Sequence, residues 1–355
     1  MAGIGAFLQR KSGRETASAA HRSADASQVA AQAAEASVKL NERVSTIAAT
    51  RTEADSLGKR YQDAANQLGH EKAVVRMAGV IAMAQLADDW PQQRQMCVDV
   101  LCGYLRMSRS AIVGNDAPEH AEREVRATVL RLIAARTSRY RPSDESVVPS
   151  WSQCEFDLSG AVIYDLDWTG LTFERRVHLT GATFGGKCRI ANSRFEYFGV
   201  LLDEVELEGS LEMYGIEARE CGVTFDHATV RSAGDLKIHL SGSPAARWEM
   251  SQLDVEGRME IHISPDVHND SVVLRRADVR GDVVIHCGDQ EMSLKREGWF
   301  DTPHLDFSGW NIHSGARVRI ESQLVDVWSA EWQPRRVDPD ADVLLTTRPA
   351  VPERS

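Results

Sequence analysis

Three histidines recur along the second half of the chain at nearly constant intervals, and imidazole is the side chain best suited to metal binding and to titration near neutral pH. His239, His262 and His286 are separated by 23 and 24 residues, and each directly follows an isoleucine. On successive coils of a repeating β-structure these imidazoles would stack roughly 4.8 Å apart, where they could bind a transition metal or form an anion site at low pH. However, no carboxylate or thiolate shares the three positions of this column, and Cys287 is expected to point inward. We therefore interpret the histidines as an exposed packing ladder and predict no metal and no cofactor.

A ladder of this kind requires coils of nearly constant length. The spacing of the apolar residues indicates such coils. Three series of apolar residues advance in parallel, with most intervals between 23 and 25 residues. Parallel series are typical of stacked coils, because each coil places the same residue type above the last. Extra residues enter mostly at one corner, at 241–247, 264–271 and 286–304. The series are Ile190, Met213, Ile238, Ile261, Ile285 and Ile320; Leu202, Phe225, Met250, Leu274 and Phe307; and Leu207, Val230, Val255, Val279 and Ile312.

The stretch from 156 to 175, FDLSGAVIYDLDWTGLTFER, indicates how the coils begin. In an extended chain two residues separated by one other face the same way, so a bend after each such pair turns every pair inward. Four short strands then make one coil of about twenty residues, and repetition winds a right-handed parallel β-helix with a packed interior. The apolar pairs recur every five positions and are Phe156/Leu158, Ala161/Ile163, Leu166/Trp168 and Leu171/Phe173.

This stretch resembles the pentapeptide-repeat family, in which the central residue of each five is Leu or Phe and the residue two before it is small, often Ala. Ala161 has alanine at that second position, whereas Phe156, Leu166 and Leu171 are bulkier. The segment from Tyr61, YQDAANQLGHEKAVVRMAGVIAMAQLADDW, is similar to the helical region that precedes the repeats in many bacterial members. The resemblance covers about residues 60–110 and 154–195 and implies a right-handed β-helix after the helices.

The first half of the chain is predicted to be helical almost throughout. From about residue 15 to 68 the sequence is rich in alanine, lacks proline and has one glycine, Gly58. Two further helices meet at Trp90 and Pro91, and another runs over about 118–139. In the long helix, apolar and alanine positions recur mostly in steps of three and four, which favours a coiled-coil seam over the alternative of a solvated or disordered arm. The seam residues are Val29, Ala33, Ala36, Leu40, Val44, Ile47, Ala54, Leu57, Tyr61 and Leu68.

These patterns predict an α+β multidomain chain. The segment RPSDESVVPS has the composition of a linker, and the last residues are rich in Pro, Asp and Arg. The expected parts are a long Ala-rich helix at 1–68, a small helical domain at 69–140, a linker at 141–150, a right-handed pentapeptide-like β-helix at 151–332 and a flexible tail at 333–355.

Charge separates the two halves. Residues 1–142 carry 20 Lys and Arg against 15 Asp and Glu, whereas residues 151–332 carry 17 against 31. An acidic field repels phosphate backbones and favours basic partners, so we expect a protein partner with a basic surface and no direct nucleic-acid binding. The candidate interaction surface is a group of glutamates in one coil: Glu204, Glu206, Glu208, Glu212, Glu217 and Glu220.

Composition and motifs exclude several classes of protein. No apolar run is long enough for a membrane span, and the first residues lack a signal-peptide pattern, so a cytoplasmic location is expected. The six cysteines show no zinc-site spacing and are interpreted as reduced, mostly buried thiols. Walker, Rossmann, nucleophile-elbow and HExxH motifs are missing, and the acids are too scattered for polysaccharide cleavage, so no enzyme is predicted.

The function expected from the sequence is therefore a non-enzymatic interaction scaffold. The long helix would assemble copies into a homo-oligomer, and the acidic β-helix would bind the partner. Two alternatives remain open. Some pentapeptide-repeat proteins mimic duplex DNA and occupy the DNA site of type II topoisomerases, although the lengthened coils here spoil a smooth rod. Bactofilins, which are also right-handed β-helices, polymerise by stacking.

Overall fold

The computed structural model describes residues 2–107, 119–140, 150–197, 199–219, 222–240, 247–264, 272–287, 309–322 and 335–347. Almost all of the predicted linker and of the corner insertions at 241–247, 264–271 and 286–304 lies outside these residues. The chain divides into two compact units, 1–60 and 61–355. None of the described helices is long and apolar enough to span a bilayer.

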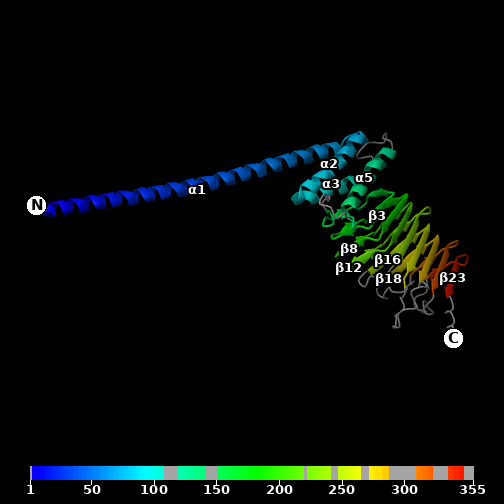
Figure 1. The fold of residues 1–355 in the computed structure, drawn as a ribbon. Coiled ribbons are helices and arrows are strands. Elements are labelled where there is room, and N and C mark those ends of the chain that lie inside the picture. The colour runs from blue at the N-terminus through cyan, green and yellow to red at the C-terminus, as the bar shows by residue number, and fades with distance from the viewer. Residues whose placement is uncertain are drawn as a thin grey trace, which may run out of the picture. The chain divides into compact units, whose positions relative to one another are not determined.

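Helix α1 (Ala2–Leu68) is the long helix expected from the alanine-rich sequence (Figure 1). Its residues are mostly strong helix formers, and Lys39 reaches Glu35 one turn earlier at 2.7 Å. Every described side chain from 21 to 56 is exposed, including those of Val29, Leu40 and Ile47. Intrinsic helix propensity therefore accounts for this part of α1, because within one chain these side chains are not packed.

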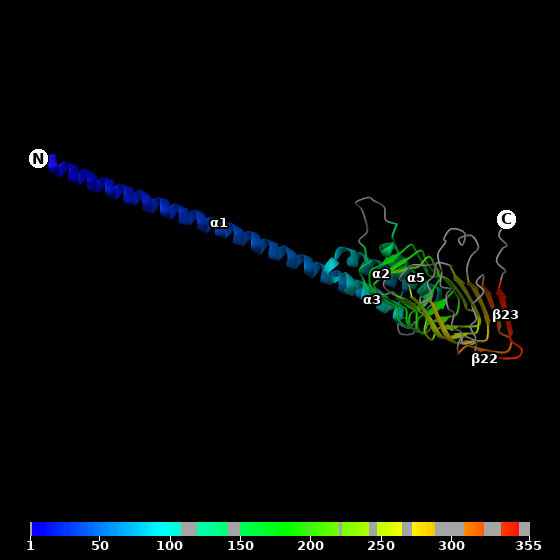
Figure 2. The same ribbon diagram turned by 90° about the horizontal axis from the view of Figure 1, so that it is seen from below.

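A small helical region follows, made of α2 (Ala73–Asp89), a short 3-10 turn η1 (Pro91–Gln93), α3 (Arg94–Arg106) and α5 (Glu119–Thr137) (Figure 2). Pro91 begins η1, a position where its missing N–H costs no hydrogen bond. Val80, Met83, Leu101 and Ile133 are fully buried and form the apolar core between these helices.

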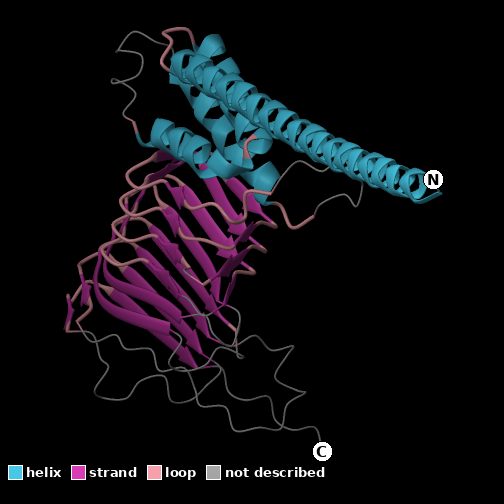
Figure 3. Cartoon of the chain, turned by 90° about the vertical axis from the view of Figure 1, so that its left-hand side faces the viewer, coloured by secondary structure: helices cyan, strands magenta, loops and turns pink. Residues whose placement is uncertain are grey.

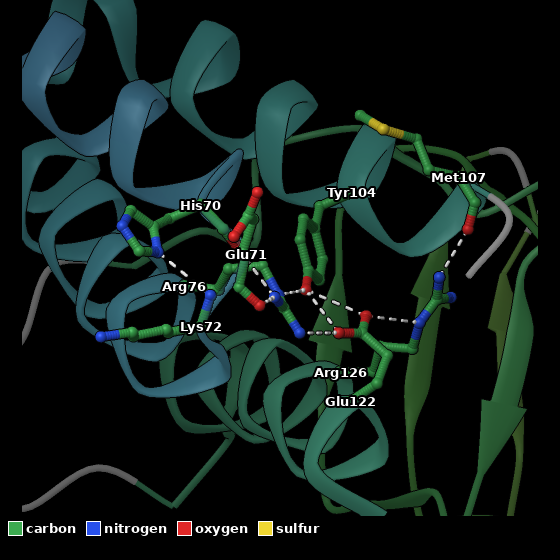
Figure 4. Close-up of polar contacts among 8 residues, drawn as sticks. All are labelled: His70, Glu71, Lys72, Arg76, Tyr104, Met107, Glu122 and Arg126. Carbon is green, nitrogen blue, oxygen red and sulfur yellow. Dashed lines mark hydrogen bonds and ion pairs between the residues drawn. The ribbon is translucent and has the colours of Figure 1, made fainter. Parts of the chain in front are cut away.

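A buried polar network also joins the helices (Figure 4). Arg76 of α2 donates to the carbonyl oxygens of His70 and Glu71 at 2.8 and 2.7 Å, and to the Glu122 carboxylate of α5 at 2.7 Å. Tyr104 of α3 donates to the same carboxylate at 2.9 Å. Arg126 adds a contact to Glu122 at 3.1 Å. The charges are paired and hydrogen-bonded, which is the condition under which burial of charge is tolerated.

The helical region covers the N-terminal end of a β-helix (Figure 3). Asp88 of α2 accepts hydrogen bonds from Arg136 of α5 at 2.6 Å and from the indole N–H of Trp151 at 2.9 Å. The Arg123 guanidinium lies 4.0 Å from the centre of the Tyr164 ring, a cation–π distance. These contacts hold the helices over the first coil, whose N-terminal edge would otherwise expose unpaired backbone groups to solvent.

The right-handed β-helix has about six turns, and its strands pair in parallel. We number its faces in chain order. The first face contains β1 (Phe156–Asp157), β5 (Val177–His178), β9 (Val200–Leu201) and β13 (Gly222–Thr224). The second contains β2 (Val162–Tyr164), β6 (Thr183–Gly185), β10 (Glu206–Leu207), β14 (Thr229–Val230), β20 (Asn311–Ile312) and β22 (Arg336–Val337).

The third face is an eight-stranded sheet and the fourth face a three-stranded sheet. The third contains β3 (Asp167–Thr169), β7 (Lys187–Ala191), β11 (Ser210–Tyr214), β15 (Asp235–Leu240), β17 (Arg258–Ile263), β19 (Asp282–Cys287), β21 (Arg317–Ser322) and β23 (Asp342–Thr347). The fourth contains β4 (Thr172–Phe173), β8 (Arg194–Glu196) and β12 (Glu217–Arg219).

The cross-section changes along the β-helix. Each coil from β1 to β12 has four short strands, as the five-residue pattern predicts. Beyond β14, the strands β16 (Arg247–Val255) and β18 (Val272–Val279) each take part in both the first and the second face, and each turns between the two faces at a residue with positive φ, Gln252 or Arg276. The separation along the chain between paired positions of the first and second faces is the same in these coils as in the earlier ones, since Val223 and Thr229 pair with Trp248 and Asp254, so the extra residues of the lengthened coils lie elsewhere in the coil.

The predicted register of the core is confirmed for the described residues; Phe307, the last member of the second series, lies outside them. Ile238 pairs with Met213 on one side and with Ile261 on the other, and Ile261 pairs with Ile285. All of these side chains are fully buried. In the first coils aromatic rings fill the interior, and the Phe173 and Phe195 rings stack with centroids 5.1 Å apart. Each coil thus buries a layer of apolar side chains against the next.

The flexible tail predicted from residue 333 is wrong for residues 335–347. β22 pairs in parallel with β20, and β23 pairs in parallel with β21, so they extend the second and third faces. The Pro, Asp and Arg content suggested a tail because strands are usually poor in these residues. On the outward side of a β-helix, however, charged residues are compatible with a strand: Asp342 lies opposite Arg317, and Val343 lies opposite Val318.

Candidate functional site: the third face of the β-helix

The third face carries ordered columns of outward side chains. Along one column, cross-strand neighbours alternate in charge in the order Asp235, Arg258, Asp282, Arg317, Asp342. Arg317 forms an ion pair with Asp282. Opposite charges directly across a strand pair stabilise a sheet by about 0.2–1 kcal/mol each. The column therefore supports the stacking of coils.

A second column, two residues further along each strand, repeats the alternation. It begins Asp167, Arg189, Glu212, Lys237, Glu260. Arg189 contacts Glu212 at 3.1 Å, and Lys237 lies 4.0 Å from Glu260. Acids and bases therefore alternate across this face, and the acidic excess of the β-helix is not concentrated there.

The third column contains the histidine ladder, arranged as the sequence predicted. His239 pairs with His262, and His262 pairs with His286. The first two rings stack with centroids 4.3 Å apart and an interplanar angle of 3°, and the next two with 4.4 Å and 20°. Tyr214 meets His239 edge to face at 6.3 Å. The ladder is thus a continuous aromatic stack on β11, β15, β17 and β19.

The sequence interpretation missed a carboxylate beside this ladder. Glu260 belongs to the neighbouring column, yet its Oε1 atom lies 2.8 Å from Nε2 of His262 and 3.8 Å from Nε2 of His286. At the far end, Oε2 of Glu321 lies 3.1 Å from Nδ1 of His286. The sequence-based interpretation rests on residues within one column. The usable signal was the spacing of Glu260 and His262, because residues i and i+2 of a strand share a face.

Burial and neighbouring charges shift the protonation of this cluster. Partial burial opposes ionisation of Glu260, but the hydrogen bond from His262 and the nearby Arg258 guanidinium outweigh it and lower the pKa of the carboxyl. For His239, burial and the adjacent His262 lower the pKa of the imidazole. Glu260 is therefore an ionised acceptor facing two imidazole rings.

The glutamates of the proposed acidic surface are divided among three faces. Glu206 lies on β10 of the second face, Glu212 on β11 of the third and Glu217 on β12 of the fourth. Glu204 and Glu208 flank β10, whereas Glu220 lies outside the described residues. Because a coil encloses the core, residues that are close in this sequence point in different directions. The set therefore does not form one continuous patch.

Arginines neutralise three of these glutamates. Glu206 pairs with Arg231, and Glu212 with Arg189. Glu217 accepts from Arg194 at 2.8 Å and from Arg139 at 3.0 Å; partial burial opposes these contacts, but together they lower the pKa of its carboxyl. Within the described part of the chain, the exposed carboxylates of Glu204 and Glu208 have no ion-pair partner. These two are the best placed to meet a partner.

The described cysteines are buried thiols. Burial raises the pKa of Cys97 and Cys154 to about 11 and that of Cys287 to about 12. Thiols with raised pKa values are poor nucleophiles and poor metal ligands at neutral pH. Cys287 points into the interior, as expected from its position after His286.

Comparison with known proteins gave no match: no family model, curated protein or solved structure is significantly similar to this chain. The β-helix and the preceding helices are therefore established by the structure alone, and the pentapeptide-repeat resemblance stays a prediction.

Proposed function

We propose that this chain is a non-enzymatic interaction scaffold in which α1 joins copies into an oligomer and the β-helix binds a protein partner. The observation that carries the proposal is the row of exposed apolar side chains on α1. Val29, Leu40, Val44 and Ile47 are between 58% and 66% exposed. Large apolar side chains on a long isolated helix are typical of a surface that is covered in an assembly.

The spacing of the seam favours a coiled coil. Ala33, Leu40, Ile47, Ala54 and Tyr61 follow one another at intervals of seven residues, which is the repeat of one core position in a left-handed coiled coil. The second core position of this register is interrupted by Arg43 and Thr50 and otherwise holds Val29, Ala36 and Leu57. Two or more copies of α1 would bury these residues against one another, so the oligomer is expected to form through this helix.

Charge reversal of the seam tests the assembly. Leu40→Glu combined with Ile47→Glu should convert the oligomer into a monomer, because neither carboxylate can be desolvated at a coiled-coil core. Light scattering at micromolar concentration measures the mass. The matched control is Asn41→Glu combined with Ala48→Glu, which adds the same charge one residue further along, outside the core positions. A wild-type chain that is already monomeric would contradict the proposal.

The pair of exposed glutamates that flank β10, Glu204 and Glu208, is proposed to bind a basic protein surface. Glu204 and Glu208 are exposed at the ends of β10, and the acidic excess of this half of the chain would speed association electrostatically. Binding should weaken as salt rises above about 0.15 M. Glu204→Lys with Glu208→Lys should abolish capture of a basic partner in low salt. Glu155→Lys with Asp340→Lys is the control, since it makes the same charge change at two other exposed sites. Equal capture by both double variants would contradict this surface.

We also propose that the β-helix is a divergent pentapeptide-repeat solenoid. Its first coils have four short strands, with Leu158, Ile163 and Trp168 directed inward from successive faces. The longer coils, with intervals of 23–25 residues between equivalent positions, distinguish it from a uniform member of that family. As part of the scaffold function, we also propose the cytoplasmic location that the sequence predicts.

Two observations make the scaffold preferable to the alternatives. Alternating acids and arginines on the third face, such as Arg189 beside Glu212, differ from the uniform negative charge of a DNA mimic. The helices over the N-terminal coil obstruct end-to-end stacking of the bactofilin kind, because Arg106 and Arg123 contact Asp157 and Tyr164 there. Inhibition of gyrase supercoiling by the purified protein would instead favour the DNA mimic, and micrometre filaments would favour the polymer.

A further inference from the structure

Three side chains of β17 and β19 bring potential metal-binding atoms together on the third face. An oxygen of Glu260 and one ring nitrogen each of His262 and His286 all lie within 4.8 Å of one another. Glu260 and His262 are two residues apart on β17, and His286 lies directly opposite His262 on β19. The backbone of two adjacent coils therefore fixes the positions of all three side chains.

The chemistry of this set suits a transition metal. Two imidazoles and one carboxylate are a frequent ligand combination for divalent zinc and its first-row neighbours. Glu260 is ionised at neutral pH, since neighbouring positive and hydrogen-bonding groups lower the pKa of its carboxyl. One anionic and two neutral ligands would leave a bound divalent ion with a single positive charge.

The surroundings of His286 resemble the support usually found behind a metal-binding histidine. Glu321 lies 3.1 Å from Nδ1 of His286, so that nitrogen can carry the proton and donate it to the carboxylate. Nε2, the nitrogen that faces Glu260 at 3.8 Å, is then left with its lone pair free. A carboxylate in this position fixes the tautomer and increases the basicity of the ligating nitrogen.

We propose that Glu260, His262 and His286 bind one divalent transition-metal ion, zinc in the first instance, and that Glu321 positions His286. Zinc–nitrogen bonds are about 2.0–2.1 Å long and lie close to the ring plane, so the His262 and His286 rings tilt toward each other from their stacked arrangement when the ion binds. The ion links two coils through their side chains. Water or a group of another molecule fills the remaining coordination positions of the ion.

His239 supplies a matched control. It belongs to the same column and stacks on His262 at 4.3 Å, but it is not among the three ligands. Loss of His239 removes one member of the aromatic ladder and leaves the proposed site intact. A metal held nonspecifically by the exposed histidines would depend equally on all three, whereas the proposed site depends on two of them and on Glu260.

The test is calorimetric titration of the full-length chain, without a histidine tag, with zinc chloride alone. We expect one ion per chain with a micromolar or lower Kd. His262→Ala and His286→Ala should each weaken binding at least about tenfold, Glu260→Gln should do the same without a change in volume, and His239→Ala should bind as wild type does. Glu321→Gln should weaken binding by about tenfold, the lower end of the range for such supporting groups.

The visible absorption spectrum of bound Co²⁺ is a second readout, and it reports on the ligands of the ion and not on the stability of the chain. Co²⁺ in a site of low coordination number absorbs strongly in the visible range, and this band should disappear in His286→Ala, or in His286→Asn if the alanine variant does not fold. Wild-type binding no tighter than millimolar would overturn the proposal. So would equal losses in His239→Ala and His286→Ala, or an unchanged cobalt spectrum in Glu260→Gln.

Discussion

At the residue scale, His227 shows how a corner of the β-helix constrains residue choice. Its φ is 59°, and the stacked corner residues Glu204, Gln252 and Arg276 have φ values of 58°, 57° and 54°. Side chains with a Cβ are disfavoured in this left-handed region, and a β-branched residue is the least tolerated. His227→Gly should therefore raise the free energy of unfolding by up to about 1 kcal/mol, and His227→Val should lower it by about 1–2 kcal/mol.

Thr229, two residues later on β14, provides the comparison for urea denaturation. It faces outward from an extended strand, where valine is favourable and glycine unfavourable. The order of the two substitutions should therefore reverse: Thr229→Gly is destabilising and Thr229→Val is nearly neutral. The same order at both sites would show that backbone conformation at the corner does not control stability.

For the stability of the β-helix, whether a side chain points inward or outward should matter more than where it lies along the strand. Ile285 is fully buried, whereas its neighbour Val284 points outward between Glu260 and Arg319. Ile285→Asp should lower the free energy of unfolding by several kcal/mol, because it places an unpaired charge in the core. Val284→Asp should change it by less than about 1 kcal/mol. Thermal and chemical denaturation compare the two, and equal effects would contradict the register.

At the scale of elements, the buried network determines how α2, α3 and α5 pack. Arg76→Met removes the guanidinium that contacts Glu122 and two backbone carbonyls, and it should cost about 3–5 kcal/mol. Tyr104→Phe removes a hydroxyl that donates to Glu122 and accepts from Nε of Arg76 at 3.1 Å, while Arg76 and Arg126 remain on the carboxylate, so it should cost less, about 1–3 kcal/mol. Similar losses in both variants would indicate that the charges are not the important members of the network.

The histidine ladder should make the β-helix sensitive to acid. Because the folded state lowers the pKa of His239, the unfolded chain takes up a proton near pH 6.5 before the folded chain does. That contribution to stability is present above pH 6.5 and is lost as the pH falls toward the folded pKa. His239→Asn should therefore show a smaller decrease in Tm between pH 7.5 and pH 5.5 than wild type. An identical decrease would mean that His239 does not contribute.

The sequence was informative about elements wherever a repeat set the pattern. Intervals of about 24 residues predicted the cross-strand neighbours of Ile238 and Ile261, because one coil length applies to every inward column. β23 was not predicted, although Leu345 follows Ile320 by 25 residues and pairs with it, because the outward charges of this segment resemble those of a tail. The repeat continues into this end of the chain, where the composition obscured it.

The candidate site was less predictable than the core. The order of the three histidines was correct, but the approach of Glu260 to two rings depends on side-chain rotamers and on the neighbouring column. The candidate acidic surface was also difficult to predict from the sequence. Glu206, Glu212 and Glu217 are close in the sequence, yet their directions depend on the corners between them.

At the scale of the whole molecule, the two units should behave independently. Residues 61–355 form a compact unit that includes the helical region and the β-helix. Removal of residues 1–60 should lower the mass to that of a monomer and leave the thermal transition of the β-helix within about 2 °C of wild type at the same chain concentration. A large decrease in Tm would show that assembly through α1 stabilises the β-helix.

The position of the helices over the first coil has a consequence for synthesis in the cell. A ribosome releases α2, α3 and α5 before it releases β1, so the surface that receives the first coil is complete when that coil emerges. Each later coil then meets a finished edge, and winding follows translation from one end. A nascent chain stalled after β4 should resist protease if the helices precede it and should be digested if they do not. Translation itself would thus supply the order in which neighbouring coils find their register.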